Sequence, residues 1–212
     1  MTRLCYDSTA ASDIPATARI VGGYVDGLFK WSDEDWARFP DAVKVRIACF
    51  SSTNDGQVGD VEKGDMTPEG SVGWVVMRRG VGIDPTIYCS RSQLPAVRAA
   101  FQLAGVAEPH YWLADYGDGV TPRPAPPIPD GAVALQYEHE AQTGGHYDLS
   151  VVADFWPGVE DHMTRETYAQ ELEPFVKETI RVILTEEYGL PQAAVETIVA
   201  ASVKAVSDKL AK

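Results

Sequence analysis

Short runs of apolar residues, many of them β-branched or aromatic, recur along the first 155 residues and alternate with polar or helix-like segments. Runs of this length and composition are typical of strands buried in a sheet. Eight of them are present: TRLCYDS, ARIVGGYVDG, AVKVRIACF, QVGDVEKGD, DPTIYCS, PHYWLADYG, AVALQYEH and HYDLSVV. The pattern therefore predicts eight strands within one main domain.

Two longer segments between these runs have the pattern of amphipathic helices. Residues 67–80 offer Thr67 as a side-chain cap, Pro68 in the first turn and Gly80 as the end. Residues 92–105 place one apolar face along the helix, made of Leu94, Val97, Phe101 and Leu103 or Ala104. Two shorter helix-like stretches are SDIPATA and SDEDWARFP, the second with Ser32 and Asp35 arranged as a capping box.

Strands that alternate with helices favour a parallel sheet, and eight of them favour closure into a barrel. Several connections are too short for a helix. Residues 117–131 contain five prolines and predict a loop of stiff, extended backbone, either a connection in place of a helix or a wall of a cleft. We therefore predict the α/β class, a TIM-like (β/α) barrel of about eight strands with few helices.

The pattern changes after Trp156. Two segments then show three-to-four spacing: Tyr168, Leu172, Phe175 or Val176, Ile180 and Ile183; and Val195, Ile198 or Val199, Ser202 or Val203, Val206 and Leu210. Neither helix can bury such a stripe alone, so each packs on the barrel, on the other helix or on another chain. We predict a barrel over residues 1–158 and a helical segment over 159–212, with attachment or oligomerisation through residues 160–212.

Charge and hydropathy exclude several classes of partner. The 212-residue chain has a formal charge of −13 and no cluster of Lys and Arg, so nucleic acid and anionic membrane surfaces are poor partners. No apolar run reaches the length of a membrane span, and the first residues do not have the pattern of a signal peptide. We expect a protein made in the cytoplasm without an export signal of its own.

The cysteines and histidines do not predict a metal site. Cys5, Cys49 and Cys89 are far apart in sequence, each within a strand-like run, and are interpreted as buried thiols. The four histidines lack ligand spacing: His110, His139, His146 and His162. Neither a metal nor an organic cofactor is expected.

Acidic residues gather where the predicted strands end. Asp60 and Glu62 are separated by one residue, so on a strand both point to one side, at a barrel rim where such folds place their chemistry. Asp7 and Asp148 occupy similar positions in the first and last strands, and Asp26 is a fifth acid. Crowded carboxylates raise one another's pKa, and glycoside cleavage requires a neutral acid beside a charged one. The alternative is that these acids cap helices or pair with basic residues.

Aromatic residues divide into two groups. Trp31, Trp36 and Trp74 lie on helix-like or loop segments and are predicted to be core residues. Trp112 and Tyr116 lie near a predicted strand end, where rings can stack on saccharides.

The chain resembles the family 25 lysozymes and, more closely, the glycoside-hydrolase-like domains of actinobacteria and their phages. The resemblance covers about residues 3–157 and rests on DVEKGDMTPEGSVGWVVMRRG, GIDPTIYCSRS, YWLADYG, ALQYEHE and GGHYDLSV. It implies a flattened barrel with Glu62 as proton donor and with Asp60, Asp7 and Asp148 as further catalytic acids. The substrate-binding residues expected beside them are Asp26, Tyr88, Trp112, Tyr116, Gln136 and Tyr137.

Two functions are compatible with this resemblance. The first is a muramidase-type hydrolase that degrades the peptidoglycan of bacterial cell walls. The group that the chain resembles implies that it is phage-encoded, and it would be released at lysis or carried on the virion. The second is a capsid or tail protein whose barrel binds glycan or is catalytically inactive and whose C-terminal helices anchor it.

Overall fold

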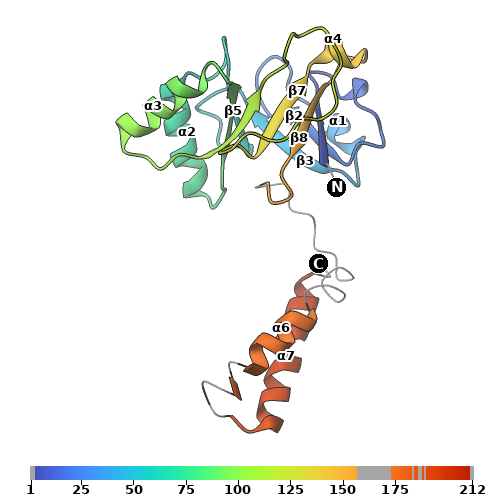
Figure 1. Ribbon diagram of the computed structural model, residues 1–212, viewed down its shortest axis with the longest axis vertical. Coiled ribbons are helices and arrows are strands. Elements are labelled where there is room, and N and C mark those ends of the chain that lie inside the picture. The colour runs from blue at the N-terminus through green and yellow to red at the C-terminus, as the bar shows by residue number, and fades with distance from the viewer. Residues whose placement is uncertain (1–2, 157–172, 183, 186–187, 189, 211–212) are drawn as a thin grey trace. The chain divides into compact units, whose positions relative to one another are not determined.

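The computed structural model describes residues 3–156, 173–182, 184–185, 188 and 190–210 (Figure 1). Two compact units are present, residues 1–160 and 161–212. The first unit contains eight strands: β1 (Arg3–Asp7), β2 (Ile20–Tyr24), β3 (Val43–Ala48), β4 (Val58–Val61), β5 (Thr86–Ser90), β6 (His110–Ala114), β7 (Ala134–Glu138) and β8 (Asp148–Val152).

The strands form a closed barrel in chain order, so the predicted eight-stranded barrel with few helices is confirmed. The barrel is mixed: β1 to β7 pair in parallel, whereas β8 is antiparallel to both β7 and β1. Only residues 139–147 separate β7 from β8, and a parallel crossover needs about a dozen residues or more. This short connection returns the chain in the opposite direction. The parallel sheet predicted from the sequence is therefore correct for β1 to β7 and wrong for β8.

The helices begin and end at the residues that the sequence offers for capping. Helix α2 (Pro68–Gly80) follows Thr67, whose hydroxyl accepts a hydrogen bond from Gly70 N at 3.0 Å. Helix α1 (Asp33–Ala37) has the predicted capping box of Ser32 and Asp35. The SDIPATA stretch forms only a 3₁₀ turn (Ala11–Asp13), and α4 (Glu140–Thr143) is one turn long.

Helix α3 (Leu94–Ala104) lies beside α2 at one side of the barrel (Figure 1). Val97 and Phe101 are fully buried, as predicted. Leu103 is instead 92% exposed, and Ala104 is also exposed. At about 100° per residue, Leu103 stands roughly 200° from Phe101 and therefore on the opposite face of the helix.

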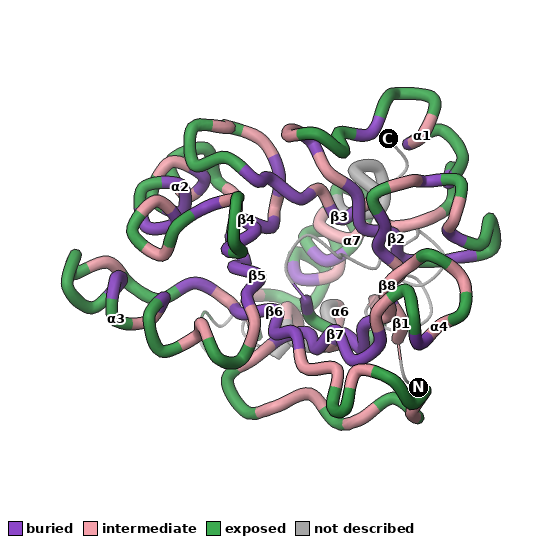
Figure 2. The backbone as a smooth tube through the Cα atoms, turned by 90° about the horizontal axis from the view of Figure 1, so that it is seen from above, coloured by how far each residue is buried: buried purple, intermediate pink, exposed green. Residues whose placement is uncertain are grey.

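Alternating side chains along the strands build two apolar cores. In β5, Ile87 and Cys89 face the outer core between strands and helices, whereas Tyr88 faces the inner core of the barrel. Buried residues accordingly follow the strands around the barrel (Figure 2). The predicted burial of the three cysteines and of Trp31, Trp36 and Trp74 is confirmed.

The proline-containing stretch over residues 117–131 contains no helix or strand and connects β6 to β7. Its backbone is attached to β7 through Arg123, whose N–H donates to Glu138 at 2.6 Å. Ile128 packs against the outer core. This stretch therefore serves as the connection that replaces a helix.

The second unit contains α6 (Glu173–Val182) and α7 (Gln192–Leu210), which contact each other. Arg181 Nε donates to Glu196 at 2.9 Å across the pair. Val195 and Val199 are buried. Several members of the predicted stripes lie outside the described residues or have undescribed side chains: Tyr168, Leu172, Phe175, Val176, Ile183, Val206 and Leu210. Across the described residues, no helix combines the length and apolar character needed to cross a bilayer.

Candidate active site

A cavity of about 80 Å³ lies at the barrel rim where β1 to β7 end and β8 begins. It brings together all four predicted catalytic acids and four of the predicted substrate-binding residues. Its walls are formed by Asp7, Tyr24, Ile47, Asp60, Glu62, Tyr88, Trp112, Tyr116, Gln136 and Asp148.

Strand register explains how distant acids meet in this cavity. Asp7 is the last residue of β1 and Asp148 the first of β8, and the two are paired directly across the antiparallel β1–β8 ladder. On β4, Asp60 points into the barrel, Val61 points into the outer core, and Glu62 follows immediately after the strand. The antiparallel return of β8 thus places Asp148 at the same rim as the ends of the parallel strands.

Glycine provides the space that Asp7 needs. Gly22 on β2 is the register partner of Asp7, and a Cβ at Gly22 would lie 2.8 Å from the Asp7 Cβ. That distance is shorter than a van der Waals contact, so any larger residue at this position would displace the carboxylate.

Gln136 connects the acids to the tyrosines of the cavity. Its Nε2 donates to Asp7 Oδ2 at 2.7 Å and to Asp148 Oδ2 at 3.3 Å. Its Oε1 accepts from the Tyr88 hydroxyl at 2.6 Å and from the Tyr116 hydroxyl. These four contacts define which end of the amide faces the acids.

Burial and mutual repulsion raise the proton affinity of the acids. Burial, then the charge of Asp148, raises the pKa of Asp7 well above its ordinary value. Burial, then the charge of Glu62, does the same to the pKa of Asp60. Burial raises the pKa of Asp148 to about 6, although the Glu140 backbone N–H opposes the shift. The cavity wall contains no Lys, Arg or His among the described residues, so protonation takes the place of ion pairing.

Asp60 and Glu62 differ in accessibility. Asp60 is 2% exposed, and its Oδ1 has no hydrogen-bond partner among the residues that the structure describes. Glu62 is exposed, and partial burial followed by the charge of Asp65 raises its pKa. The polar hydroxyl of Tyr88 partly offsets this rise in the pKa of Glu62. The site therefore combines an accessible acid with a buried carboxylate that has an unused acceptor.

Trp112 lies lower in the barrel than the sequence indicates. It is 1% exposed, its Nε1 donates to Ser150 Oγ at 3.0 Å, and its ring packs edge-on against Tyr88 and Trp156. Because Trp112 occupies the middle of β6, it forms the cavity floor and presents no free face to a sugar. Tyr116, two residues beyond β6, is partly exposed and remains the aromatic candidate for stacking.

Asp26 and Tyr137 do not line the cavity. Asp26 accepts hydrogen bonds from Cys49 N at 2.7 Å and Phe50 N at 3.1 Å, so its carboxylate joins the loop after β2 to the loop after β3. Tyr137 is adjacent to Gln136 on β7 and therefore points the opposite way, into the outer core. The alternation that directs Gln136 inward excludes Tyr137 from the same face.

Sequence reasoning missed Tyr24 and Ile47 in the cavity wall. Tyr24 stands two residues after Gly22 on β2, and Ile47 stands two residues after Val45 on β3. Period-two alternation from these inward positions is the signal that could have identified both.

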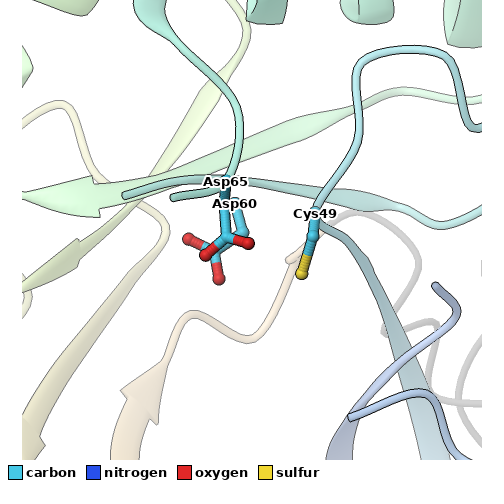
Figure 3. Close-up of side chains that lie close together, drawn as sticks. All are labelled: Cys49, Asp60 and Asp65. Carbon is cyan, nitrogen blue, oxygen red and sulfur yellow. The ribbon is translucent and has the colours of Figure 1, made fainter. Parts of the chain in front are cut away.

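A group of possible metal ligands adjoins the cavity. The Cys49 sulfur and one carboxylate oxygen each from Asp60 and Asp65 lie within 4.8 Å of one another (Figure 3). Cys49 directly follows β3, Asp60 lies on β4 and Asp65 lies in the loop after β4.

Three solved structures are similar to this chain. The catalytic domain of endolysin ply40 from bacteriophage P40 of Listeria monocytogenes has 14% identity and a TM-score of 0.46, with 72% of this chain and 94% of that chain covered. GHIP, a glycosyl hydrolase 25 of Streptococcus pneumoniae, has 12% identity and a TM-score of 0.49, with 79% of this chain and 92% of that chain covered. A muramidase from Acremonium alcalophilum has 14% identity and a TM-score of 0.45, with 70% of this chain and 92% of that chain covered.

No protein-family model matches the chain, and no curated protein matches it. The three structural likenesses have low identities and TM-scores below 0.5. The proposed function consequently rests on the cavity and its residues.

Proposed function

We propose that the barrel is a muramidase-type glycoside hydrolase that cleaves peptidoglycan between N-acetylmuramic acid and N-acetylglucosamine. The observation that carries this proposal is the meeting of Asp7, Asp60, Glu62 and Asp148 at one cavity, with Glu62 accessible at its mouth. Glycoside cleavage needs a protonated carboxyl for the leaving oxygen and negative charge near the oxocarbenium-like centre. The choice of peptidoglycan follows the resemblance of the DVE and YDLSV motifs to the family 25 lysozymes.

Glu62 is assigned as the proton donor. It is the exposed acid of the four, and its raised pKa keeps more of the protonated form available near neutral pH. Glu62 would protonate the leaving glycosidic oxygen and then accept a proton from the water that completes hydrolysis.

Asp60 is assigned as the residue that orients the substrate's acetamido group. Its unpartnered Oδ1 can accept a hydrogen bond from the acetamido N–H. That contact would direct the acetamido carbonyl oxygen toward the anomeric carbon, as in substrate-assisted glycosidases. As the leaving group departs, the carbonyl oxygen would bond to the anomeric carbon and form a cyclic intermediate. Water would then open this intermediate by attack at the anomeric carbon.

Asp148, with a pKa of about 6, supplies negative charge beside this centre at neutral pH, and Gln136 holds Asp148 and Asp7 in place. The same amide orients the hydroxyls of Tyr88 and Tyr116. A change at Gln136 would therefore alter the positions of two acids and two tyrosines together.

The cavity is small compared with typical ligand pockets of about 300–1,000 Å³. Its volume of about 80 Å³ suits the reacting centre, while the rest of the glycan would lie across the rim. The net charge of −13 opposes long-range attraction to an anionic wall, so affinity must come from short-range contacts or from a particle that delivers the domain. We place the protein on the virion or at the cell wall after lysis.

A virion structural role is the second candidate. The separate helical unit favours it, because exposed apolar side chains there, Tyr188 at 69% and Ile198 at 40%, could contact another subunit. In that case the barrel would bind glycan without cleaving it.

Clearing of actinobacterial cell-wall suspensions tests the two candidates. We expect the full chain to reduce turbidity and to release new reducing ends, and Glu62→Gln to lower the rate by about 10²-fold or more. Glu69→Gln is the matched control, because Glu69 is exposed on α2 and does not line the cavity. Equal rates for Glu62→Gln and the native chain would contradict the assigned acid. Sedimentation with cell walls but no release of reducing ends would favour the structural role.

A further inference from the structure

Three side chains from separate segments meet beside the cavity. Cys49 follows β3, Asp60 lies on β4, and Asp65 belongs to the loop before α2. Asp65 N donates to Glu62 O and Met66 N donates to Asp60 O, both at 3.1 Å, so a tight turn returns Asp65 over the end of β4. Figure 3 shows the two carboxylates next to each other with the Cys49 sulfur beside them.

The donor set is chemically selective. One sulfur and two carboxylate oxygens suit a borderline-soft ion such as Zn²⁺, whereas Mg²⁺ and Ca²⁺ favour oxygen ligands alone. Zinc bonds of about 2.0–2.3 Å place neighbouring donors roughly 3.5 Å apart in a tetrahedral site. The three donor atoms all lie within 4.8 Å of one another, so a bound ion would draw them closer together.

The buried member of the cluster has an unused acceptor. Asp60 is only 2% exposed, and no donor in the described part of the chain forms a hydrogen bond with its Oδ1. An unpaired buried carboxylate oxygen is costly, and each such atom in a folded protein needs an explanation. Within the described part of the chain, no Lys, Arg or His forms an ion pair with Asp60 or Asp65. The cluster thus has two adjacent carboxyl groups, an available acceptor and a neighbouring sulfur.

We propose that Cys49, Asp60 and Asp65 bind one Zn²⁺ ion at the rim of the barrel. On binding, the Cys49 thiol and the protonated fraction of Asp60 release their protons to solvent, the Cys49 sulfur bonds the metal, and each aspartate contributes one carboxylate oxygen. Water completes the coordination, because Asp65 is partly open to solvent. The ion offsets the repulsion among the acids. The sequence does not reveal this site, because its ligands are separated by 11 and 5 positions and lack a zinc-binding spacing.

The site also implies a competition, and this part rests on the proposed function. Asp60 cannot orient an acetamido group while it coordinates zinc. Bound zinc would therefore inhibit glycan cleavage, and a chelator would restore it.

Metal binding by the full chain tests the site without any glycan. After equilibrium dialysis against Zn²⁺, we expect one zinc per chain, and we expect Cys49→Ser and Asp65→Asn to lower the affinity about tenfold or more. Cys5→Ser is the matched control, because Cys5 is also buried but lies outside the cluster. Loss of the site without loss of the fold is verified by circular dichroism of each variant. Absence of bound zinc in the native chain, or undiminished affinity in both variants, would overturn the proposal.

Cobalt provides a direct readout of the sulfur ligand. Co²⁺ bound by the native chain should show a thiolate-to-metal charge-transfer band that Cys49→Ser lacks and Cys5→Ser retains. Excess Ca²⁺ or Mg²⁺ should not displace the cobalt. A native complex without the band would exclude Cys49 as a ligand.

Cell-wall clearing separates this site from the proposed function. If the chain clears walls in chelator, zinc should inhibit the native chain and have little effect on Cys49→Ser. Zinc binding combined with clearing that zinc leaves unchanged would overturn the competition. A chain that binds zinc but never clears walls would contradict the hydrolase alone.

Discussion

Asp7 and Asp148 face each other across the β1–β8 pairing and share one hydrogen-bond donor, the side-chain amide of Gln136. The Nε2 atom of Gln136 is 2.7 Å from Asp7 Oδ2 and 3.3 Å from Asp148 Oδ2. Two carboxyl groups this close disfavour simultaneous ionisation, and a neutral amide reduces their repulsion without removing either acid. The stability of the barrel and the charge of the cavity are consequently linked.

Replacement of the shared donor should destabilise the barrel. Gln136→Glu keeps the size of the side chain but removes Nε2 and adds an acid next to Asp7 and Asp148. We expect a loss of about 1–3 kcal/mol in the free energy of unfolding at pH 7.5, and a smaller loss at pH 4.5 where the acids are protonated. Urea denaturation at the two pH values measures this. Gln102→Glu on the exposed face of α3 is the control and should change little; a loss independent of pH would contradict the electrostatic cause.

Removal of one buried acid should have the opposite effect. The pKa of Asp7 is raised by burial and by Asp148, so as pH rises above about 4 the unfolded chain loses its proton first. The loss of folding stability caused by the ionised Asp7 is absent below the ordinary pKa of the carboxyl and is complete above its raised pKa in the folded protein. Asp7→Asn should therefore exceed the native chain in stability at pH 7.5, by on the order of 1–3 kcal/mol, and match it near pH 3.5.

Thermal or urea denaturation across this pH range checks the sign. Asp13→Asn provides a comparison, because Asp13 is not part of the cavity wall. If the native chain were more stable than Asp7→Asn at neutral pH, the prediction would be wrong. The contacts of the Asp7 carboxylate would then outweigh the cost of burying its charge.

Tyr116 should contribute to glycan binding more than Trp112 does. If sugars stack on its partly exposed ring, Tyr116→Ala should raise KM by about threefold to tenfold, which corresponds to the roughly 0.5–1.5 kcal/mol of an aromatic contact. Tyr116→Phe retains the ring and removes only the hydroxyl contact to Gln136. Steady-state kinetics on soluble peptidoglycan fragments distinguish the two; equal KM values for Tyr116→Ala and the native chain would exclude stacking.

Close packing against β4 should make one glycine irreplaceable. A Cβ at Gly59 would lie 2.9 Å from the fully buried ring of Trp74, so Gly59→Ala should cost about 1–3 kcal/mol of stability through overpacking. At Gly73 on α2, no atom of the described residues lies within 4 Å of the corresponding position, and Gly73→Ala should stabilise the protein by about 0.5–1 kcal/mol. Chemical denaturation of both variants measures the contrast, and stabilisation by Gly59→Ala would refute the packing argument.

Local features of the sequence were sufficient for the strands, the helix caps and the acids at strand ends. The Ser32–Asp35 capping box and the Thr67 cap depend on residues within one turn, so their chemistry is present in the sequence itself. Period-two alternation likewise placed Asp60 on the face opposite to Val61, whereas Gln136 was expected in the cavity from the family resemblance. The same alternation, applied strictly, excludes Tyr137 from the cavity.

Contacts between distant segments decided the rest. The antiparallel direction of β8 follows from a connection too short to cross the barrel, and it brings Asp148 opposite Asp7. The depth of Trp112 in the barrel depends on the stagger of β6. The carboxylate of Asp26 accepts a hydrogen bond from Cys49 N, on the loop after β3. The Cys49, Asp60 and Asp65 cluster arises only when β3, β4 and the following turn are assembled. The sequence by itself determined which residues face inward, because that choice is local; barrel closure determined which of them meet, because it sets the register between strands.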